Sequence, residues 1–399
     1  MRRFANFFVM AVFLLGFTRP AQAQAGVKFV DARVGYDFGE QITFSARIES
    51  PNPIKEIQLL FRDEREENTR VIPLQADPDG FVSYQYDAAS NLLRPFAKII
   101  FWFQVILQDG GTAQSANYSF RYADDRFDWV TRQEKNISVH WYDGDEAFGM
   151  AALDAARNGL QTIQGLFPVE AGEPINIYIY SSPTELQETL FMGGETWVAG
   201  HASPALGVAL VSIKPSMEQN IAMQQQIPHE LAHVMLYRYV GEEYDRLPTW
   251  LQEGISSIAE LYPNPDYQRA LDVALENEML IPMADLCDPF PRDASRAFLA
   301  YAESASFTRY LYNAYGSSEL DDLIRAYADG LSCEPGATQA LGASLTYLDA
   351  RWRESVLGAN LLGVAWRNFL PYLILFGLIL IVPLAEGIAM LRRRKKDGN

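Results

Sequence analysis

The sequence has few cysteines, few histidines and a deficit of basic residues. Cys287 and Cys333 are the only cysteines among 399 residues, which argues against a zinc site built from thiolates. In an oxidising compartment the two could pair, and the alternative is two unrelated buried thiols. The chain has 33 lysines and arginines against 50 acids, a net charge of -17. So much negative charge repels the phosphates of nucleic acid, so binding to nucleic acid is excluded.

The N-terminal end has the features of an export signal. Residues 1–23 contain Arg2 and Arg3, an apolar run, and a small-residue motif that ends at Ala23. This order predicts a secretory signal peptide cleaved after Ala23. Because Arg19 is close to the expected cut, an uncleaved anchor is the alternative.

The C-terminal end has the features of a membrane anchor. Residues 359–391 include the apolar run Phe369–Met390, which is long enough to cross about 30 Å of hydrocarbon. The tail 392–399 is basic and predicts a cytoplasmic C-terminus. A buried core helix is the alternative. The sequence therefore predicts a single-pass protein of the cell membrane, with everything between the two ends outside the cytoplasm.

The long segment between these ends divides into two predicted domains. Residues 24–125 alternate apolar and polar side chains, as in Ile42–Ile48, and turn signals such as Asp77–Gly80 interrupt the pattern. This texture is typical of an antiparallel β-sandwich. Residues 126–358 begin with short strands and continue mainly as helices. The predicted fold class is therefore α+β: a sandwich, then a small sheet followed by helices, then one transmembrane helix.

The segment with the clearest chemistry is His229-Glu230-Leu231-Ala232-His233. Two histidines at i and i+4 project from the same face of a helix, so both imidazoles can bind one Zn²⁺ ion. Glu230 would lie beside that ion, where it can act as the general base for a water molecule whose pKa the metal lowers. With only 4 histidines in the chain, a coincidental pair on a solvated helix is the weaker interpretation.

The candidate for the third zinc ligand is Glu253, because a catalytic zinc normally has three protein ligands and one open position. Thr249 and Gln252 form a capping-box pattern, which predicts that Glu253 lies in the first turn of a new helix. Gly241 is a plausible end for the preceding helix. The alternative role for Glu253 is a carboxylate that stabilises the start of its own helix.

The two motifs HELAH (229–233) and PTWLQEG (248–254) resemble those of the glutamate-zincin (gluzincin) metallopeptidases of the peptidase MA clan. Further stretches between residues 124 and 357 are similar to bacterial peptidase MA-like domains. The resemblance does not extend to residues 24–125. It implies His229, His233 and Glu253 as ligands of one zinc ion and Glu230 as general base. Pro228 departs from the family pattern: either the helix begins there, or a longer helix from Met217 is kinked.

A tetrahedral intermediate needs a hydrogen-bond donor opposite the metal, and the candidates are Tyr301, which we favour, Tyr244 and His201. The strand Gly207–Ile213 resembles the edge strand on which gluzincins bind an extended peptide; the alternative is an interior strand.

The sequence therefore predicts a membrane-anchored zinc metallopeptidase that hydrolyses extracytoplasmic peptides or proteins. The main alternative is a catalytically silent peptidase-like ectodomain that acts as a binding or adhesion module. An intramembrane protease is excluded because Gln224, Gln225 and Gln226 precede the motif, and the only strong span after the signal begins more than a hundred residues later. The sequence does not give the side-chain specificity or the oligomeric state.

Overall fold

The structure is a computed structural model that describes residues 26–191, 200–358, 369–370 and 372–376. The described residues form two compact units: the first contains the residues up to Arg126 together with Phe191, and the second contains the other residues from Phe127 onward. Among the described helices, none combines the length and the apolar character needed to cross a bilayer. The predicted signal (1–23) and cytoplasmic tail (392–399) lie outside the described residues, as does most of the predicted anchor (359–391).

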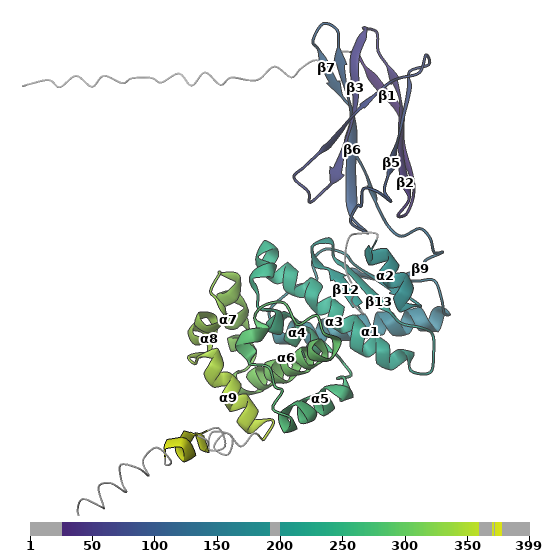
Figure 1. The fold of residues 1–399 in the computed structure, drawn as a ribbon. Coiled ribbons are helices and arrows are strands. Elements are labelled where there is room, and N and C mark those ends of the chain that lie inside the picture. The colour runs from purple at the N-terminus through teal and green to yellow at the C-terminus, as the bar shows by residue number, and fades with distance from the viewer. Residues whose placement is uncertain (1–25, 192–199, 359–368, 371, 377–399) are drawn as a thin grey trace, which may run out of the picture. The chain divides into compact units, whose positions relative to one another are not determined.

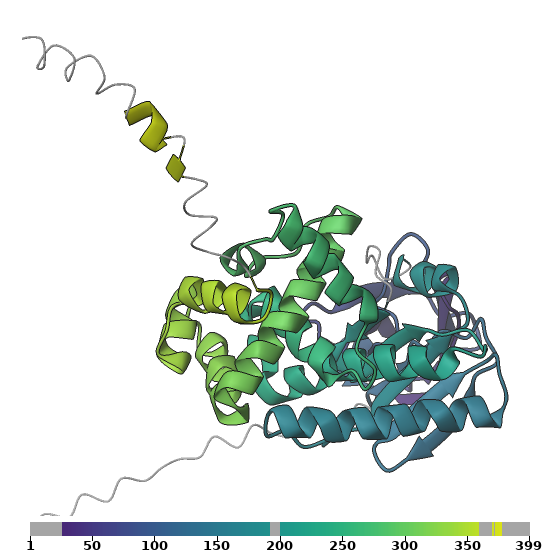
Figure 2. The same cartoon turned by 90° about the horizontal axis from the view of Figure 1, so that it is seen from below.

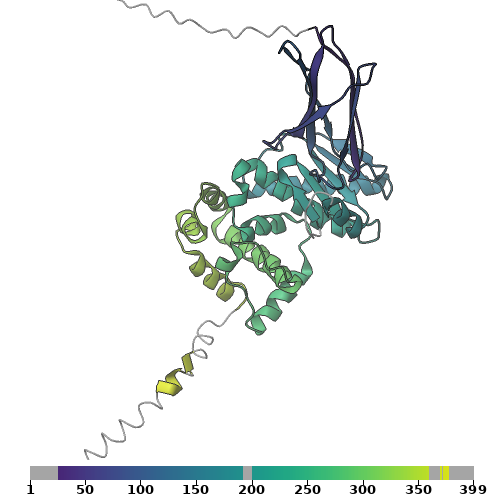
Figure 3. The same ribbon diagram turned by 45° about the horizontal axis from the view of Figure 1, so that its top comes forward.

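The first unit consists of two antiparallel sheets, which Figures 1 and 3 show as two layers of strands. One sheet has the order β1-β2-β5; the other has the order β4-β3-β6-β7, with β8 also paired to β6. The rings of Phe44 and Phe61, one from each sheet, lie 5.0 Å apart in the core. The predicted antiparallel architecture is confirmed. The strands are β1 Lys28–Asp37, β2 Gln41–Glu49, β3 Ile54–Asp63, β4 Arg70–Leu74, β5 Phe81–Asp87, β6 Lys98–Leu107, β7 Thr112–Gln114 and β8 Tyr118–Arg121.

The second unit begins with a mixed sheet of order β12-β13-β11-β10-β9. The three inner strands are parallel, and β9 and β12 pair antiparallel at the two ends. The expectation that residues 207–213 form an edge strand is therefore wrong, because β13 lies between β11 and β12. The strands are β9 Val130–Glu134, β10 Ile137–Trp141, β11 Ile175–Tyr180, β12 Gly200–Ser203 and β13 Val208–Ser212.

Helix α1 (Glu146–Leu166) packs on β10 and on α3 (Gln219–Val240), the helix that contains the HELAH motif. Asp145 caps α1 by accepting the Phe148 N–H at 2.9 Å. Gly159 allows α1 to approach α3 closely, since a Cβ there would lie only 2.7 Å from the Cβ of Pro228. The sheet and α1 thus fix the position of α3.

The helices that follow α3 in the sequence gather on one side of the unit in Figure 2, with the sheet on the other side. They form one continuous apolar core with α1, α3 and the sheet, in which Trp250, Phe307 and Trp352 are completely buried. Their bounds are α4 Thr249–Ala259, α5 Pro265–Glu276, α6 Ala294–Tyr315, α7 Ser317–Ala328, α8 Cys333–Leu341 and α9 Leu345–Ser355, with the 3₁₀ turns η2 Gly241–Arg246 and η3 Met283–Leu286. Helix α2 Pro183–Phe191 and the 3₁₀ turn η1 Pro204–Leu206 connect strands of the sheet.

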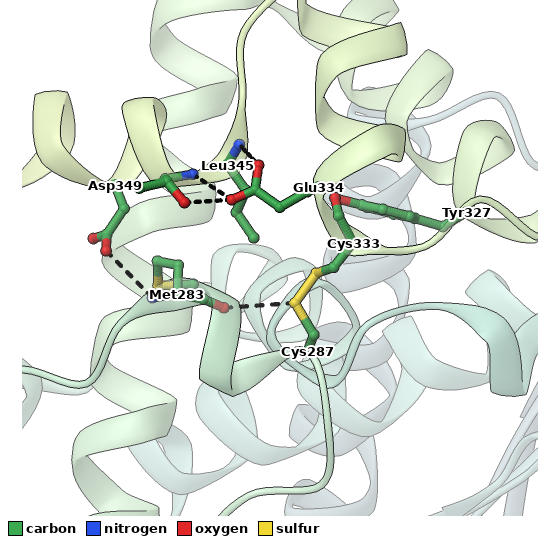
Figure 4. The surroundings of a disulfide bond; sticks show 8 residues. Met283, Cys287, Tyr327, Cys333, Glu334, Leu345 and Asp349 are labelled. Carbon is green, nitrogen blue, oxygen red and sulfur yellow. Dashed lines mark hydrogen bonds between the residues drawn. A yellow bond between two sulfur atoms is a disulfide. The ribbon is translucent and has the colours of Figure 1, made fainter.

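A disulfide bond joins Cys287, just after η3, to Cys333 at the start of α8 (Figure 4). The alternative of two separate thiols is therefore wrong. The neighbouring Glu334 carboxylate accepts the backbone N–H of Leu345 at 2.8 Å and that of Thr346 at 3.0 Å, which ties α8 to the start of α9. The bond holds the segment that precedes α6 against the C-terminal helices.

Candidate metal centre

Helix α3 presents both histidines of the motif on one face. It is continuous through Pro228, so the longer of the two helices considered for this segment is the one that forms. It ends at Gly241, whose φ of 70° only glycine adopts readily, as predicted for this position. The rings of His229 and His233 lie 5.2 Å apart. The spacing of the motif therefore translates directly into two neighbouring imidazoles.

Glu253 reaches the same point from α4, although the start of that helix differs from the prediction. No side chain caps α4, because Thr249 is already its first helical residue and donates its N–H to the Cys287 carbonyl at 3.2 Å. Gln252 donates instead to the Leu247 carbonyl at 2.8 Å, which stabilises the turn before the helix. The capping-box prediction is wrong, and Glu253 is the fifth helical residue rather than part of the first turn.

The three predicted ligands converge closely enough to share one ion. Oε2 of Glu253 lies 3.4 Å from Nε2 of His229 and 3.6 Å from Nε2 of His233. All three ligand atoms lie within 4.8 Å of one another. Bonds of 2.0–2.1 Å to a tetrahedral zinc ion place ligand atoms about 3.4 Å apart. Two imidazole nitrogens and one carboxylate oxygen are also the donor set of a catalytic zinc with one open position. The residues therefore fit this metal.

The other ring nitrogen of each histidine is held by a second residue. Nδ1 of His229 lies 3.0 Å from Oε1 of Glu260, and Nδ1 of His233 lies 2.9 Å from the hydroxyl of Tyr244. A carboxylate can only accept a hydrogen bond, so Nδ1 of His229 donates and its Nε2 carries the lone pair. Such outer contacts fix both the tautomer and the orientation of a metal-binding imidazole. Both Nε2 atoms are thereby directed at Glu253.

The charges of the site strongly favour a cation between these side chains. Burial alone would lower the pKa of His229, but its hydrogen bonds to Glu253 and Glu260 and the charge of Glu230 raise this pKa well above its usual value. Burial alone would raise the pKa of Glu253. The charges and hydrogen bonds of the two histidines outweigh this effect and lower the pKa of Glu253 below its usual range. A divalent ion supplies the positive charge that this arrangement of carboxylates favours.

The predicted general base, Glu230, and the predicted hydrogen-bond donor, Tyr301, both interact electrostatically with Glu253. Glu230 is buried with 7% exposure, and burial raises its pKa while the two histidines oppose the shift. Tyr301 lies in α6. Burial and, to a smaller extent, the negative charges of Glu253 and Glu230 raise the pKa of its hydroxyl. The hydroxyl therefore stays protonated and can donate a hydrogen bond. The centre of the Tyr301 ring lies 5.1 Å from that of Phe290, and the two rings are almost perpendicular. His201, the other histidine considered, lies in β12.

Two features of the site were not predicted. Glu260 was not considered as a site residue, although it follows Glu253 by two helical turns and so continues the same face of α4. Tyr244 was considered as a donor to the substrate, but the structure places its hydroxyl on His233. Only the position of η2, which carries Tyr244 between the two helices, reveals this second role.

Comparison with known proteins places residues 155–358, just over half of the chain, in the peptidase MA superfamily. No curated protein matches the chain. A myokine structure is 14% identical to this protein, and the match covers 24% of this chain and 95% of the myokine chain, with a TM-score of 0.20. OgpA from Akkermansia muciniphila is 19% identical over 26% of this chain and 31% of its own, with a TM-score of 0.22.

A carbohydrate-binding module of family 56, a β-1,3-glucan-binding domain, is 9% identical and covers 24% of this chain and 98% of its own, with a TM-score of 0.17. TM-scores this low do not establish a common fold, so the sequence match alone assigns the family. That match contains both histidines, Glu230 and Glu253. The chain belongs to the peptidase MA superfamily.

Proposed function

We propose that the protein is a zinc-dependent metallopeptidase that hydrolyses peptide bonds in extracytoplasmic peptides or proteins. One observation carries the proposal: the Nε2 atoms of His229 and His233 lie 3.4 and 3.6 Å from the same oxygen of Glu253, while Nδ1 of each ring is held by another residue. When bound, the ion supplies a Lewis acid that lowers the pKa of a water molecule and polarises a carbonyl group.

The protein's own residues account for the proton transfers and for the binding of the substrate. Glu230 accepts a proton from the attacking water and gives it to the amine that leaves when the C–N bond breaks. Burial and the resulting rise of its pKa suit Glu230 to both halves of this transfer. Tyr301, kept protonated, donates a hydrogen bond to the oxygen on which negative charge develops.

The sheet offers a place for the substrate backbone. Among the described strands, β12 is terminal in its sheet, next to β13, and both contact α3. An extended peptide can pair with the main chain of such a strand, so we assign to β12 the role expected for residues 207–213. We also propose that the apolar segment 369–390 anchors the enzyme and that the basic tail faces the cytoplasm.

The test is to substitute Glu230→Gln in the full-length protein. This variant keeps the three ligands, so its zinc content should match that of the wild type, while peptide hydrolysis falls at least about 10²-fold because the proton acceptor is lost. Metal analysis and cleavage of a peptide library, with and without a chelator, measure the two properties separately. Unchanged hydrolysis in the variant contradicts the mechanism. Zinc binding by the wild type without turnover of any peptide supports the binding module instead.

A further inference from the structure

The position of Pro228, directly before the first ligand, has a consequence for the metal centre. Proline has no backbone N–H, and its ring displaces the carbonyl four residues earlier, so the Gln224 carbonyl cannot form its helical hydrogen bond. Helix α3 nevertheless continues to Val240. One carbonyl in the second turn of this helix, five residues before His229, is therefore available to another part of the chain.

The partner of this carbonyl comes from the end of α4. The backbone N–H of Leu261 donates to the Gln224 carbonyl at 2.9 Å. Leu261 follows Glu260, which ends α4 with φ of -57° and ψ of 132°. An ordinary residue at position 228 would supply an N–H that competes with Leu261 for this acceptor. The proline therefore leaves the acceptor to α4.

This backbone bond lies next to the contact that orients the first ligand. Oε1 of Glu260 is 3.0 Å from Nδ1 of His229, and the side chain of Glu260 is only 6% exposed. Gln224 and His229 on α3 thus bind the consecutive residues Leu261 and Glu260. These two adjacent hydrogen bonds between α3 and the end of α4 restrict both the position and the rotation of the Glu260 carboxylate.

Helix α1 also packs against Pro228. Gly159 faces the Pro228 ring so closely that a Cβ there would lie 2.7 Å from its Cβ and 2.9 Å from its Cγ. This contact leaves α3 no room to move toward α1. We propose that Pro228 is a positioning residue: it frees the Gln224 carbonyl to fix the end of α4, so that Glu260 holds His229 in the orientation that binds the metal.

The inference rests on the metal site of the proposed function, and metal affinity tests it without reference to hydrolysis. The dissociation constant for Zn²⁺ is measured by chelator competition on the full-length protein. Loss of an outer partner of a metal ligand typically weakens metal binding 10–100-fold. We expect Glu260→Ala to weaken zinc binding within this range and Pro228→Ala to weaken it about 10-fold. Glu276→Ala, which removes an exposed acid of α5, is the matched control and should leave zinc affinity unchanged.

A double mutant separates positioning from simple stability. If Pro228 acts through Glu260, Pro228→Ala causes no further loss of zinc affinity when Glu260 is already alanine. With glutamine at position 260, an acceptor oxygen remains and the effect of Pro228→Ala should persist. A Pro228→Ala variant that unfolds at a lower temperature but binds zinc like the wild type overturns the inference. The inference is also overturned if Pro228→Ala lowers zinc affinity by the same factor in the wild type and in the Glu260→Ala variant.

A second variant covers the case in which Pro228→Ala does not fold. Leu261→Pro removes the donor of the same hydrogen bond without touching α3, and the extended ψ of Glu260 suits a residue before proline. It should weaken zinc binding about as much as Pro228→Ala, and wild-type affinity in this variant overturns the inference. A wild-type protein that binds no zinc overturns the proposed function as well. Zinc binding by the wild type that neither variant weakens overturns this inference alone.

Discussion

The ionisation of Glu303, a buried acid outside the metal centre, predicts how the stability of the second unit depends on pH. Glu303 lies in α6 with 0% exposure, and its Oε1 accepts the Ile281 N–H at 2.9 Å. Its Oε2 has no hydrogen-bond partner among the described residues. Burial raises its pKa from 4.5 to about 8, and the Ile281 N–H and Arg353 only partly oppose this shift. The folded protein therefore keeps this carboxyl neutral at neutral pH.

The sign of the effect follows from proton binding. Between pH 4.5 and about 8 the unfolded chain has lost this proton and the folded chain retains it, so the free energy of unfolding falls as pH rises through this window. Each pH unit within the window costs about 1.4 kcal/mol, which amounts to about 3 kcal/mol at pH 7. Above pH 8 both states are ionised and the cost stays constant at about 5 kcal/mol.

Glu303→Gln removes this titration, and the amide oxygen of the glutamine can still accept the hydrogen bond from the Ile281 N–H. We expect the variant to be about as stable as the wild type at pH 5 and more stable by about 3 kcal/mol at pH 7. Urea unfolding at several pH values, followed by the fluorescence of the buried Trp250 and Trp352, measures the difference. Glu276→Gln, at an exposed acid of α5, is the control. The reasoning is refuted if the variant shows the same pH slope as the wild type.

Three further predictions concern the metal centre and the disulfide. Tyr301→Phe should lower kcat for peptide hydrolysis about 10²–10³-fold without changing zinc content, as measured by steady-state kinetics and metal analysis. Gly254→Ala should weaken zinc binding and lower the unfolding temperature, because its Cβ would lie 2.0 Å from Oγ1 of Thr308 and would push α4 away from α6. Replacing Cys287 and Cys333 by serine should lower the free energy of unfolding by about 4 kcal/mol, and a reductant should then have no further effect in a urea titration.

The predictable part of the site is the part that local geometry determines. His229 and His233 lie on one helix, so their spacing alone places both rings on one face. Glu253 needed only a short connection between two helices, and the structure provides it through η2. The outer contacts depend on how helices pack. Nothing in the local sequence shows that the end of α4 meets His229 or that Tyr244 contacts His233, so Glu260 and this contact of Tyr244 were not predicted.

The same distinction explains the errors in the fold. The run 207–213 was recognised as a strand, but its neighbour β12 has only four residues, of which Gly200, Ala202 and Ser203 give no strand pattern. The family resemblance therefore favoured an edge strand, and the alternative of an interior strand is the one that forms. Thr249 and Gln252 match a capping box by residue type, yet Cys287, from a distant part of the chain, supplies the acceptor for the Thr249 N–H. Local patterns cannot reveal such partners.

The short helix α4 shows why the third ligand is so well placed. A helix of 11 residues is barely stable by itself in water. Main-chain hydrogen bonds to other elements support α4 at both ends: Thr249 is bound to the Cys287 carbonyl, and Leu261, just past its end, to the Gln224 carbonyl. Glu253 lies between these supports, away from the turns where helices fray. The direction of its carboxylate therefore depends on two attachments made by residues far from α4 in the sequence.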